Sequence, residues 1–283
     1  MAEGSKAVLI TGCSTGIGRA TAERLAAGGR TVYATARRPE SIADLEAKGC
    51  RTLALDVTDE ESMTAAVAHV QQVEGAVGAL VNNAGYSQSG AIEDVSMQSV
   101  RRQFETNVFG LLRMCQLVLP GMRAQGHGRI VNVSSMGGKL VFPGGGIYHA
   151  TKHAVEALSD ALRFEVRGFG IGVSIIEPGL IKTEFGKAAQ TSIDEGTSAD
   201  GPYASFNQAV GKKTLDAYEG PMARLAAPPD AVARAIERAI TSRRPKPRYV
   251  VTAGARVLLA TRRALPDRGW DAMMRQQYPS PGR

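Results

Sequence analysis

Three closely spaced glycines near the start of the chain constrain its fold more than any other feature. Gly12, Gly16 and Gly18 follow the apolar run 7–11, and an apolar pattern of helical period begins near Ile17. The expected order is therefore strand, glycine turn, helix. Such a turn bends the backbone sharply, lets a pyrophosphate approach it and presents free helix N-terminal amides to the anion. The spacing differs from the commoner G-x-G-x-x-G, but its position favours a dinucleotide site over a plain tight turn.

Strand and helix patterns alternate along the rest of the chain. Further apolar strand patterns occupy 31–35, 52–55, 79–81, 128–133, 172–176 and 248–251, with helical segments between most of them. This alternation predicts an α/β fold: a single doubly wound Rossmann-type domain with a mostly parallel sheet of about seven strands and helices on both faces.

The domain organisation follows from changes in composition. We expect residues 1–253 to form one domain that carries the dinucleotide site. A polar segment over 182–227, rich in Gly, Ser and Asp with helical patches around 203–218, reads as a substrate-loop insertion. Residues 254–283 read as a basic amphipathic C-terminal extension that packs on the same domain.

Composition and charge exclude several other classes. Three cysteines without CxxC spacing indicate neither a disulfide framework nor a zinc site, which suits a reducing compartment. No signal peptide or long apolar span is visible. The net charge of +7 is concentrated in 241–283, which holds ten Lys and Arg against two acids and lacks interleaved aromatic residues. We therefore expect a soluble, cytoplasmic protein with no nucleic-acid partner.

The residues after the second strand pattern bear on the choice of cofactor. NAD enzymes place an acid about 20 residues beyond the glycines to hold the ribose 2′-hydroxyl, whereas an arginine accommodates a 2′-phosphate. This chain has Arg37 and Arg38, and a guanidinium matches phosphate in a bidentate way. The sequence predicts a preference for NADP(H) over NAD(H). The alternative is that both arginines are solvated loop residues.

A tyrosine and a lysine four residues apart begin a later helical pattern. This spacing places Tyr148 and Lys152 on one helix face, about 5 to 6 Å apart at Cβ. A nearby ammonium lowers the pKa of a phenol, which would make Tyr148 a usable general acid or base. Many solvated helices show the same spacing, so the pair alone decides nothing. His149 and His153 have the spacing of metal ligands, but no acid or cysteine completes a site, and we expect no metal.

Two further segments leave alternatives open. Asn107 lies inside a long helix predicted over 98–124, where its backbone could hold a water or where it could cap a kink before Gly110. Residues 255–277 suit either packing over a substrate cleft or an interfacial helix on an anionic membrane. Pro266 interrupts that stretch, which favours packing.

Taken together, these motifs resemble those of the short-chain dehydrogenase/reductases of the classical type. The matching elements, in order, are Thr11-Gly12-x-x-x-Gly16-Ile17-Gly18, Asn83-Ala84-Gly85, Asn107, Ser135, Tyr148-x-x-x-Lys152 and Pro178-Gly179. The resemblance covers about residues 6–252, and the full set of motifs in this order is far more specific than any single motif. Within the family the chain looks most similar to the 17β-hydroxysteroid and retinol dehydrogenase-like branch.

The resemblance implies a catalytic set and a cofactor set. Tyr148 would exchange a proton with the substrate oxygen, and Lys152 would lower its pKa and hold the nicotinamide ribose. Ser135 would hydrogen-bond the carbonyl, and Asn107 would hold a water that relays protons. The implied cofactor-binding residues are Gly12, Thr15, Gly16, Ile17, Gly18, Arg37, Asp56, Val57, Asn83, Ala84, Gly85, Tyr148, Lys152, Pro178, Gly179, Ile181 and Thr183.

The implied function is that of an NADP(H)-dependent oxidoreductase. It would interconvert an alcohol and a ketone or aldehyde on a lipophilic substrate of steroid, retinoid or fatty acyl type, and it would be a homo-oligomer. A second hypothesis is a regulator that binds NADP(H) and senses redox state without turnover. A third is peripheral association with a membrane through residues 255–277.

Overall fold

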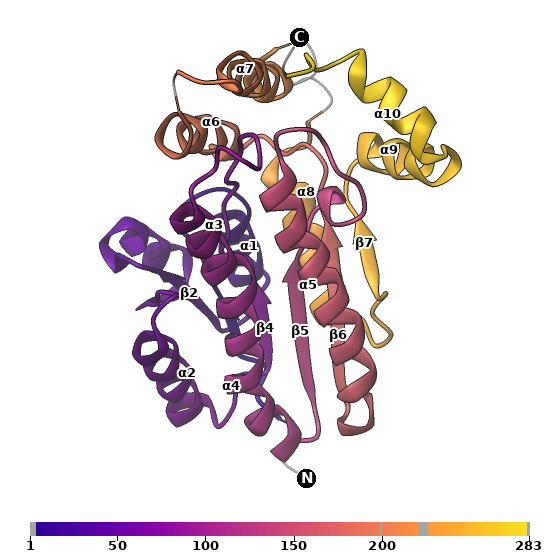
Figure 1. Cartoon of the computed structure of the whole chain (residues 1–283). Coiled ribbons are helices and arrows are strands. Elements are labelled where there is room, and N and C mark those ends of the chain that lie inside the picture. The colour runs from indigo at the N-terminus through magenta and orange to yellow at the C-terminus, as the bar shows by residue number, and fades with distance from the viewer. Residues whose placement is uncertain (1–3, 199, 221–225, 282–283) are drawn as a thin grey trace.

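One parallel sheet organises the computed structural model, which describes residues 4–198, 200–220 and 226–281 (Figure 1). The described residues form a seven-stranded sheet in the order β3-β2-β1-β4-β5-β6-β7, with every pairing parallel. The strands are β1 (Val8–Ile10), β2 (Val32–Ala36), β3 (Cys50–Ala54), β4 (Ala79–Asn82), β5 (Gly128–Val133), β6 (Ile171–Glu177) and β7 (Arg248–Val250). The fold class predicted from the sequence is confirmed.

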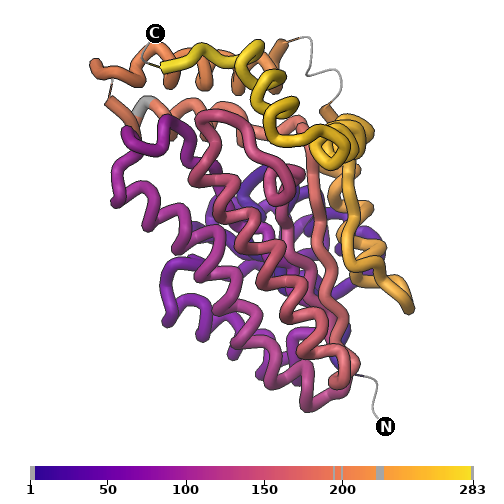
Figure 2. The backbone as a smooth tube through the Cα atoms, turned by 45° about the vertical axis from the view of Figure 1, so that its right-hand side comes forward, coloured from indigo at the N-terminus to yellow at the C-terminus, as the bar shows by residue number. Residues whose placement is uncertain are grey.

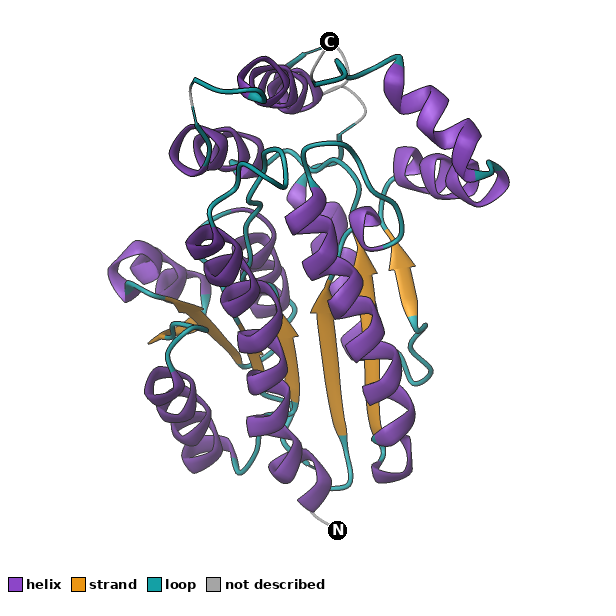
Figure 3. Cartoon of the chain, in the orientation of Figure 1, coloured by secondary structure: helices purple, strands orange, loops and turns teal. Residues whose placement is uncertain are grey.

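Helices cover both faces of the sheet, as the purple ribbons in Figure 3 show. On one side lie α1 (Gly16–Ala27) and α8 (Pro229–Thr241), and on the other lie α2 (Glu60–Glu74), α4 (Gly110–Ala124) and α5 (Gly146–Glu165). Shorter turns of helix are η1 (Pro39–Lys48), η3 (Met136–Gly138) and η4 (Arg167–Phe169). The strand order reverses between β1 and β4, and ligands bind such sheets at the carboxyl ends of the strands beside that point.

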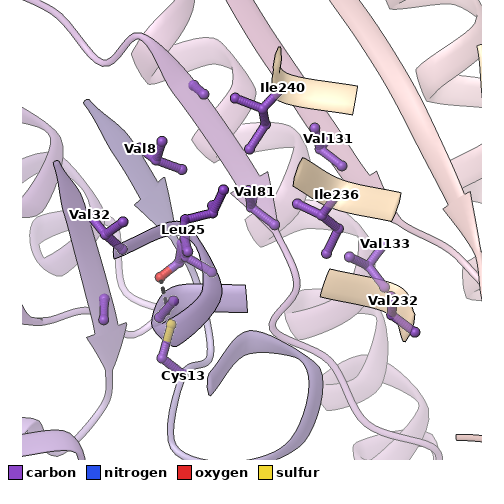
Figure 4. Close-up of a cluster of buried hydrophobic side chains, with 14 of the residues drawn as sticks. Val8, Cys13, Leu25, Val32, Val81, Val131, Val133, Val232, Ile236 and Ile240 are labelled. Carbon is purple, nitrogen blue, oxygen red and sulfur yellow. Dashed lines mark hydrogen bonds between the residues drawn. The ribbon is translucent and has the colours of Figure 1, made fainter. Parts of the chain in front are cut away.

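The two buried clusters follow from the alternation of side chains along each strand. In β1, Val8 and Ile10 enter the cluster under α1 and α8, while Leu9 enters the cluster under the opposite helices. Figure 4 shows Leu25 of α1 and Ile236 of α8 in the first cluster, with Val81 of β4 between them. Burying each such side chain stabilises the fold by about 1.5 to 3 kcal/mol, so the central strands are anchored from both sides.

The long helix expected over 98–124 is present but divided. It consists of α3 (Met97–Phe104), a π-helical turn η2 (Glu105–Phe109) and α4. Single π-helical turns inside α-helices are rare and frequent at functional sites. A Cβ on Gly110 would lie 2.2 Å from the carbonyl oxygen of Val57, so glycine there lets the helix approach the end of β3. Asn107 therefore lies in a widened turn.

Two pairs of helices lie beyond the carboxyl ends of the strands (Figures 1 and 2). The insertion forms α6 (Phe185–Gly196) and α7 (Ala204–Glu219), and the extension forms α9 (Ala253–Ala264) and α10 (Asp267–Arg275). Helix α6 was not expected from the sequence. Of the ranges assigned above, residues 1–3, 199, 221–225 and 282–283 lie outside the described residues.

The apolar face of the extension packs onto the loop that follows η3. Trp270 and Met274 are buried against Leu140, with Leu258 and Leu265 beside them, and the Trp270 Nε1–H donates to the carbonyl oxygen of Val141 at 3.3 Å. Val257, on the same helix as Leu258, is 65% exposed. Among the described residues, none of the helices combines the length and apolar character needed to span a bilayer.

Candidate cofactor cleft and active site

The glycine turn after β1 has the geometry that an anion site needs. Gly12 and Gly16 have φ angles of +73° and +61°, which favour glycine. A Cβ on Gly18 would lie 2.2 Å from the Gly12 carbonyl oxygen, so only glycine fits there. Thr15 precedes α1 and makes no side-chain cap hydrogen bond. The first-turn amides of α1, including that of Ile17, are therefore not capped by Thr15, as binding of a phosphate would require.

Hydrogen bonds join this turn to the segment after β4. Asn83 Nδ2 donates to the carbonyl oxygens of Thr11 and Gly12, both at 2.9 Å. The backbone amides of Asn83 and Ala84 donate to Thr11 Oγ1 at 3.0 Å. The sequence analysis does not predict these hydrogen bonds of Thr11. A hydroxyl at the end of an otherwise apolar strand is the sequence feature that could have indicated them. Gly85 leaves room beside Asn107.

The neighbouring strand ends place the residues expected at the adenosine side. Arg37 follows β2, is exposed, and makes no ion pair with any described residue. Asp56 follows β3 and accepts hydrogen bonds from the Thr58 amide and hydroxyl at 2.9 and 2.8 Å. Val57 is buried beside it. The sheet brings these residues to the same edge, because β2 and β3 pair in parallel.

The residues after β6 lie at the other end of the candidate cofactor site. The Pro178 carbonyl accepts a hydrogen bond from the Met136 amide at 2.9 Å. Gly179 would carry a Cβ only 2.3 Å from Thr252 Oγ1, which explains the glycine. Ile181 is buried. Thr183 reaches back, with its Cγ2 3.2 Å from the Cβ position of Gly16, so the insertion crosses over the glycine turn.

Ser135, Tyr148 and Lys152 meet between β5 and α5. Lys152 Nζ donates to the Val133 carbonyl at 2.9 Å and lies 5.8 Å from the centre of the Tyr148 ring. Ser135 Oγ accepts the Gly137 amide at 3.0 Å, and the Ser135 side chain lies close enough to Tyr148 to lower its pKa. The structure thus brings together three of the four expected catalytic residues at one point.

The electrostatics of this centre differ from the expectation. Burial raises the pKa of Tyr148 to about 12, and the Ser135 hydrogen bond opposes the rise. Burial lowers the pKa of Lys152 to about 8, and the negative charge of Glu156 opposes the fall. The predicted lowering of the Tyr148 pKa by Lys152 is therefore wrong for this structure, because desolvation of the phenol dominates. At neutral pH Tyr148 holds its proton.

Asn107 links the π-helical turn to the catalytic helix. Its Nδ2 donates to the Tyr86 carbonyl at 2.9 Å and to Thr151 Oγ1 at 3.1 Å, and its Oδ1 accepts the Tyr86 amide at 3.1 Å. The side chain is fully engaged by protein groups, and it is 1% exposed. Any water held at this position would have to bond the backbone of the widened turn.

Comparison with known proteins now places the chain. Residues 6–194 match the family model described as short chain dehydrogenase. The chain belongs to the short-chain dehydrogenase family. Among curated relatives of this dehydrogenase, the uncharacterized oxidoreductase YbbO of Escherichia coli K12 is 36% identical over 270 residues, covering 95% of the chain and 94% of the relative.

Two other relatives of this short-chain dehydrogenase have more specific names. An NADPH-dependent 3-dehydrocapnine reductase of Ornithobacterium rhinotracheale is 35% identical over 93% of the chain and 94% of the relative. A 3-ketodihydrosphingosine reductase of Bacteroides thetaiotaomicron is 40% identical over 70% of the chain and 71% of the relative. The chain is therefore an oxidoreductase of this family. The narrower placement in the 17β-hydroxysteroid and retinol dehydrogenase-like branch stays a prediction.

Solved structures show the same fold. A short-chain dehydrogenase from Streptomyces avermitilis superposes with a TM-score of 0.79 at 34% identity, covering 98% of this chain and 96% of that one. A Burkholderia phymatum relative in complex with NAD has a TM-score of 0.79 at 26% identity, covering 98% and 97%. The closed form of serine dehydrogenase with NADP+ has a TM-score of 0.74 at 28% identity, covering 86% and 93%. Members of the family thus bind NAD or NADP.

Two aromatic residues of the insertion belong to the site of this dehydrogenase but escaped the sequence argument. The Phe185 ring packs edge-on against the Tyr148 ring at 5.6 Å between centres, and Tyr218 lies 6.4 Å from Phe185. Burial raises the pKa of Tyr218. Phe185, two positions after Thr183, could have been noticed as an aromatic residue next to the site, but the segment around it is polar in composition. In the described residues, no group of three His, Cys, Asp or Glu is arranged to hold a metal.

A buried acid pair lies behind Lys152 in this dehydrogenase. Glu156 and Glu177 share Arg248, with N–O distances of 3.1 Å to each, and Lys139 Nζ lies 3.0 Å from Glu156. Burial, and then the negative charge of Glu156, raise the pKa of Glu177 to about 7. Arg248 also contacts Asp160 at 2.5 Å, so one proton on the pair leaves two negative charges on the three acids against the positive charges of Arg248 and Lys139.

This pair predicts a stability that depends on pH. The unfolded chain releases the Glu177 proton near pH 4.5 while the folded chain keeps it until about pH 7, so the free energy of unfolding falls as pH rises across that window. Glu177→Gln mimics the protonated acid and removes this dependence. We expect its Tm, relative to wild type, to rise by about 2 to 4 °C between pH 5 and pH 8.

Thermal unfolding at the two pH values measures this effect. Glu165→Gln, at an exposed position of α5, is the matched control and should show the same Tm difference from wild type at both pH values. A Glu177→Gln difference that does not change with pH would show that the acid is ionised throughout.

Proposed function

We propose that the chain is an NADP(H)-dependent carbonyl reductase and alcohol dehydrogenase acting on a lipophilic substrate, with Tyr148 as the general acid in reduction. The observation that carries the proposal is the convergence of Ser135, Tyr148 and Lys152 at the carboxyl edge of the sheet, where the glycine turn also lies. A nucleotide-sensing regulator needs no such constellation.

The residues of the candidate cofactor site fit a dinucleotide phosphate. The uncapped first turn of α1 and the left-handed Gly16 suit a pyrophosphate, and exposed Arg37 suits a 2′-phosphate. Asp56 and Val57 would meet the adenine. The remaining proposed contacts along the cofactor are those of Gly12, Thr15, Ile17, Gly18, Asn83, Ala84, Gly85, Pro178, Gly179, Ile181 and Thr183. When bound, NADPH supplies the hydride.

The side chains of the protein would hydrogen-bond and protonate the carbonyl oxygen of the substrate. Ser135, oriented by the Gly137 amide at Oγ, would donate its hydroxyl hydrogen to the carbonyl oxygen. Tyr148, which holds its proton at neutral pH, would give that proton to the same oxygen as negative charge develops there. Lys152 would hold the nicotinamide ribose, and Asn107 would keep the π-helical turn against α5. The protonated phenol is the form of Tyr148 that reduction requires.

An apolar cavity supports the lipophilic substrate. It measures about 470 Å³ and is lined by Ala91, Ile92, Glu93, Gly144, Tyr203, Phe206 and Pro281. Ile92 Cδ1 lies 2.9 Å from the Cβ position of Gly146, two residues before Tyr148. The reductases of 3-dehydrocapnine and 3-ketodihydrosphingosine among the relatives make 3-keto compounds of that kind the first substrates to test. Steroids and retinoids complete the panel.

The cofactor preference gives a second prediction. Arg37→Ala is expected to lower kcat/KM for NADPH by about 10- to 100-fold, because the charge-assisted contacts to the 2′-phosphate contribute about 1.5 to 3 kcal/mol. NADH, which lacks that phosphate, should change little. Steady-state rates with both cofactors measure the ratio, and Arg30→Ala, outside the cleft residues, is the control. An equal loss with both cofactors would contradict the assignment.

The extension and the quaternary structure complete the proposal. We propose one domain over 1–253 with its insertion at 182–227, and an extension over 254–283 whose apolar face is used in packing near the substrate cavity. This packing leaves little apolar surface for a membrane.

Two exposed aromatic side chains favour a homo-oligomer. They are Phe109 and Phe164, which are 51% and 81% exposed. A monomeric mass in light scattering would contradict that assembly.

A further inference from the structure

His149, the residue after Tyr148, holds the loop that carries Ser135. Its Nδ1 lies 3.0 Å from the Gly137 carbonyl oxygen, and its Nε2 lies 3.2 Å from the Phe142 amide nitrogen. One imidazole thus bonds both ends of the segment 137–142. The side chain is 6% exposed, and the ring packs against those of Tyr148 and Phe142 at 5.6 and 5.9 Å between centres.

Two glycines make room for this ring. A Cβ on Gly137 would lie 2.4 Å from Nδ1, and a Cβ on Gly145 would lie 2.7 Å from Nε2. Both distances are far below van der Waals contact, so any larger residue at either position would expel the imidazole. The glycine-rich loop and His149 are therefore matched in shape.

The contacts determine which ring nitrogen carries the proton. A backbone amide only donates, so Nε2 must accept from Phe142, and Nδ1 must then carry the hydrogen and donate to Gly137. A doubly protonated ring would leave the Phe142 amide without its acceptor. Burial lowers the pKa of His149 to about 4, with the Gly137 carbonyl opposing the fall, so the neutral ring is the form present at physiological pH.

The same glycine connects His149 to Ser135. The Gly137 carbonyl accepts from His149, and the Gly137 amide donates to Ser135 Oγ at 3.0 Å. That amide occupies an acceptor position of the serine oxygen, which leaves the hydroxyl hydrogen free to point elsewhere. The path runs from the helix residue beside Tyr148, through Gly137, to the Ser135 hydroxyl, which lowers the pKa of Tyr148.

We propose that His149 is a positioning residue for the active site, which sets the placement of Ser135 relative to Tyr148 by fixing Gly137 and Phe142 to α5. It does not touch the reacting atoms. The inference deepens the proposed function and rests on it for its kinetic consequence, whereas the hydrogen-bond path stands on the contacts alone. His153, one turn later on the same helix, is exposed, and its Nδ1 lies 2.9 Å from the backbone carbonyl oxygen of His149 rather than at the loop.

Hydrogen exchange of labelled full-length protein tests the path without any substrate. In His149→Ala the amides of both Phe142 and Gly137 are expected to exchange at least about tenfold faster, because the first loses its acceptor and the second loses its alignment on Ser135. Long-range nitrogen–proton correlation spectra of the wild type should show the Nδ1–H tautomer. An Nε2–H tautomer, or unchanged exchange at Gly137, would overturn the proposal. His153→Ala is the matched control and should leave both amides protected.

Kinetics test the consequence for catalysis. His149→Ala is expected to lower kcat for carbonyl reduction by about 10- to 100-fold, since small misplacements of catalytic groups cost about that much. NADPH affinity should stay within about a factor of three, a separation of kcat from binding that general unfolding would not produce. His149→Gln, which offers one donor and one acceptor, should recover part of the rate. A wild-type kcat in the alanine variant would overturn the proposal.

The two kinds of failure can be told apart. If the wild type turns over no carbonyl, the proposed function fails, and the exchange and tautomer measurements still decide whether His149 holds the loop. If the wild type is active and the exchange results are as expected while kcat is unchanged in His149→Ala, the function stands and the positioning role is refuted.

Discussion

Replacing Tyr148 by phenylalanine is expected to lower kcat for carbonyl reduction by about 100- to 10,000-fold, the range that a positioned general acid contributes. The variant keeps the aromatic ring that packs against Phe185 at 5.6 Å, so the fold and the cofactor cleft should be retained. Initial rates with NADPH and a saturating 3-keto substrate give kcat. Fluorescence titration with NADPH gives the affinity, which should stay close to that of the wild type.

Tyr249→Phe is the matched control for this experiment. The Tyr249 hydroxyl accepts a hydrogen bond from the Lys246 amide at 3.0 Å, outside the catalytic centre and the proposed substrate cavity. Its removal should leave kcat within about a factor of two. If Tyr148→Phe turned over as fast as Tyr249→Phe, Tyr148 would not be the proton donor, and the proposed chemistry would be wrong.

Gly18→Ala is expected to have the largest effect on stability and on cofactor binding together. The new Cβ would lie 2.2 Å from the Gly12 carbonyl oxygen and 2.5 Å from Asn83 Nδ2. Backbone at Gly12 cannot yield without opening the turn, so we expect a loss of about 3 kcal/mol of stability, or about 6 to 12 °C in Tm. NADPH affinity should fall by more than about tenfold, because the anion site is built by the same turn.

Two other glycines separate the causes of that loss. Gly168→Ala meets no atom within 4 Å and needs no unusual backbone angle, so it should be neutral. Gly29→Ala also meets nothing, but its φ of +75° adds backbone strain, and it should cost only about 1 kcal/mol. A Gly18→Ala protein that melts and binds NADPH like Gly168→Ala would show that the turn is not packed as described.

The fold could be predicted because its strands are short β-branched runs bounded by glycine and polar residues. The helix α6 could not, because Phe185–Gly196 contains glycine, threonine and serine, which are poor helix formers. It is held instead by packing: a Cβ on Gly186 would lie 2.7 Å from the Tyr218 ring. Such contacts between helices distant along the chain leave no periodic signal in the sequence.

The candidate site could be predicted where backbone geometry selects residue types. Glycines at positive φ and small residues at strand ends carry that information. The depth at which a side chain is buried does not follow from residue spacing, so the predicted direction of the Tyr148 pKa shift was wrong. The two histidines show the same limit, because i and i+4 spacing cannot distinguish buried His149 from exposed His153. Two side chains on the same helix face can differ in burial, because different neighbouring segments pack over them.

Transfer of deuterium from NADPH to a carbonyl substrate tests the proposed function most directly. NADPH labelled at the transferred position is incubated with wild-type protein and a long-chain 3-keto compound, and the alcohol is analysed by mass spectrometry. We expect one deuterium on the carbinol carbon, formed rapidly by the wild type and at least about 100-fold more slowly by Tyr148→Phe. Tight NADPH binding without deuterium transfer to any carbonyl of the panel would contradict the enzymatic proposal and favour a protein that only senses the nucleotide.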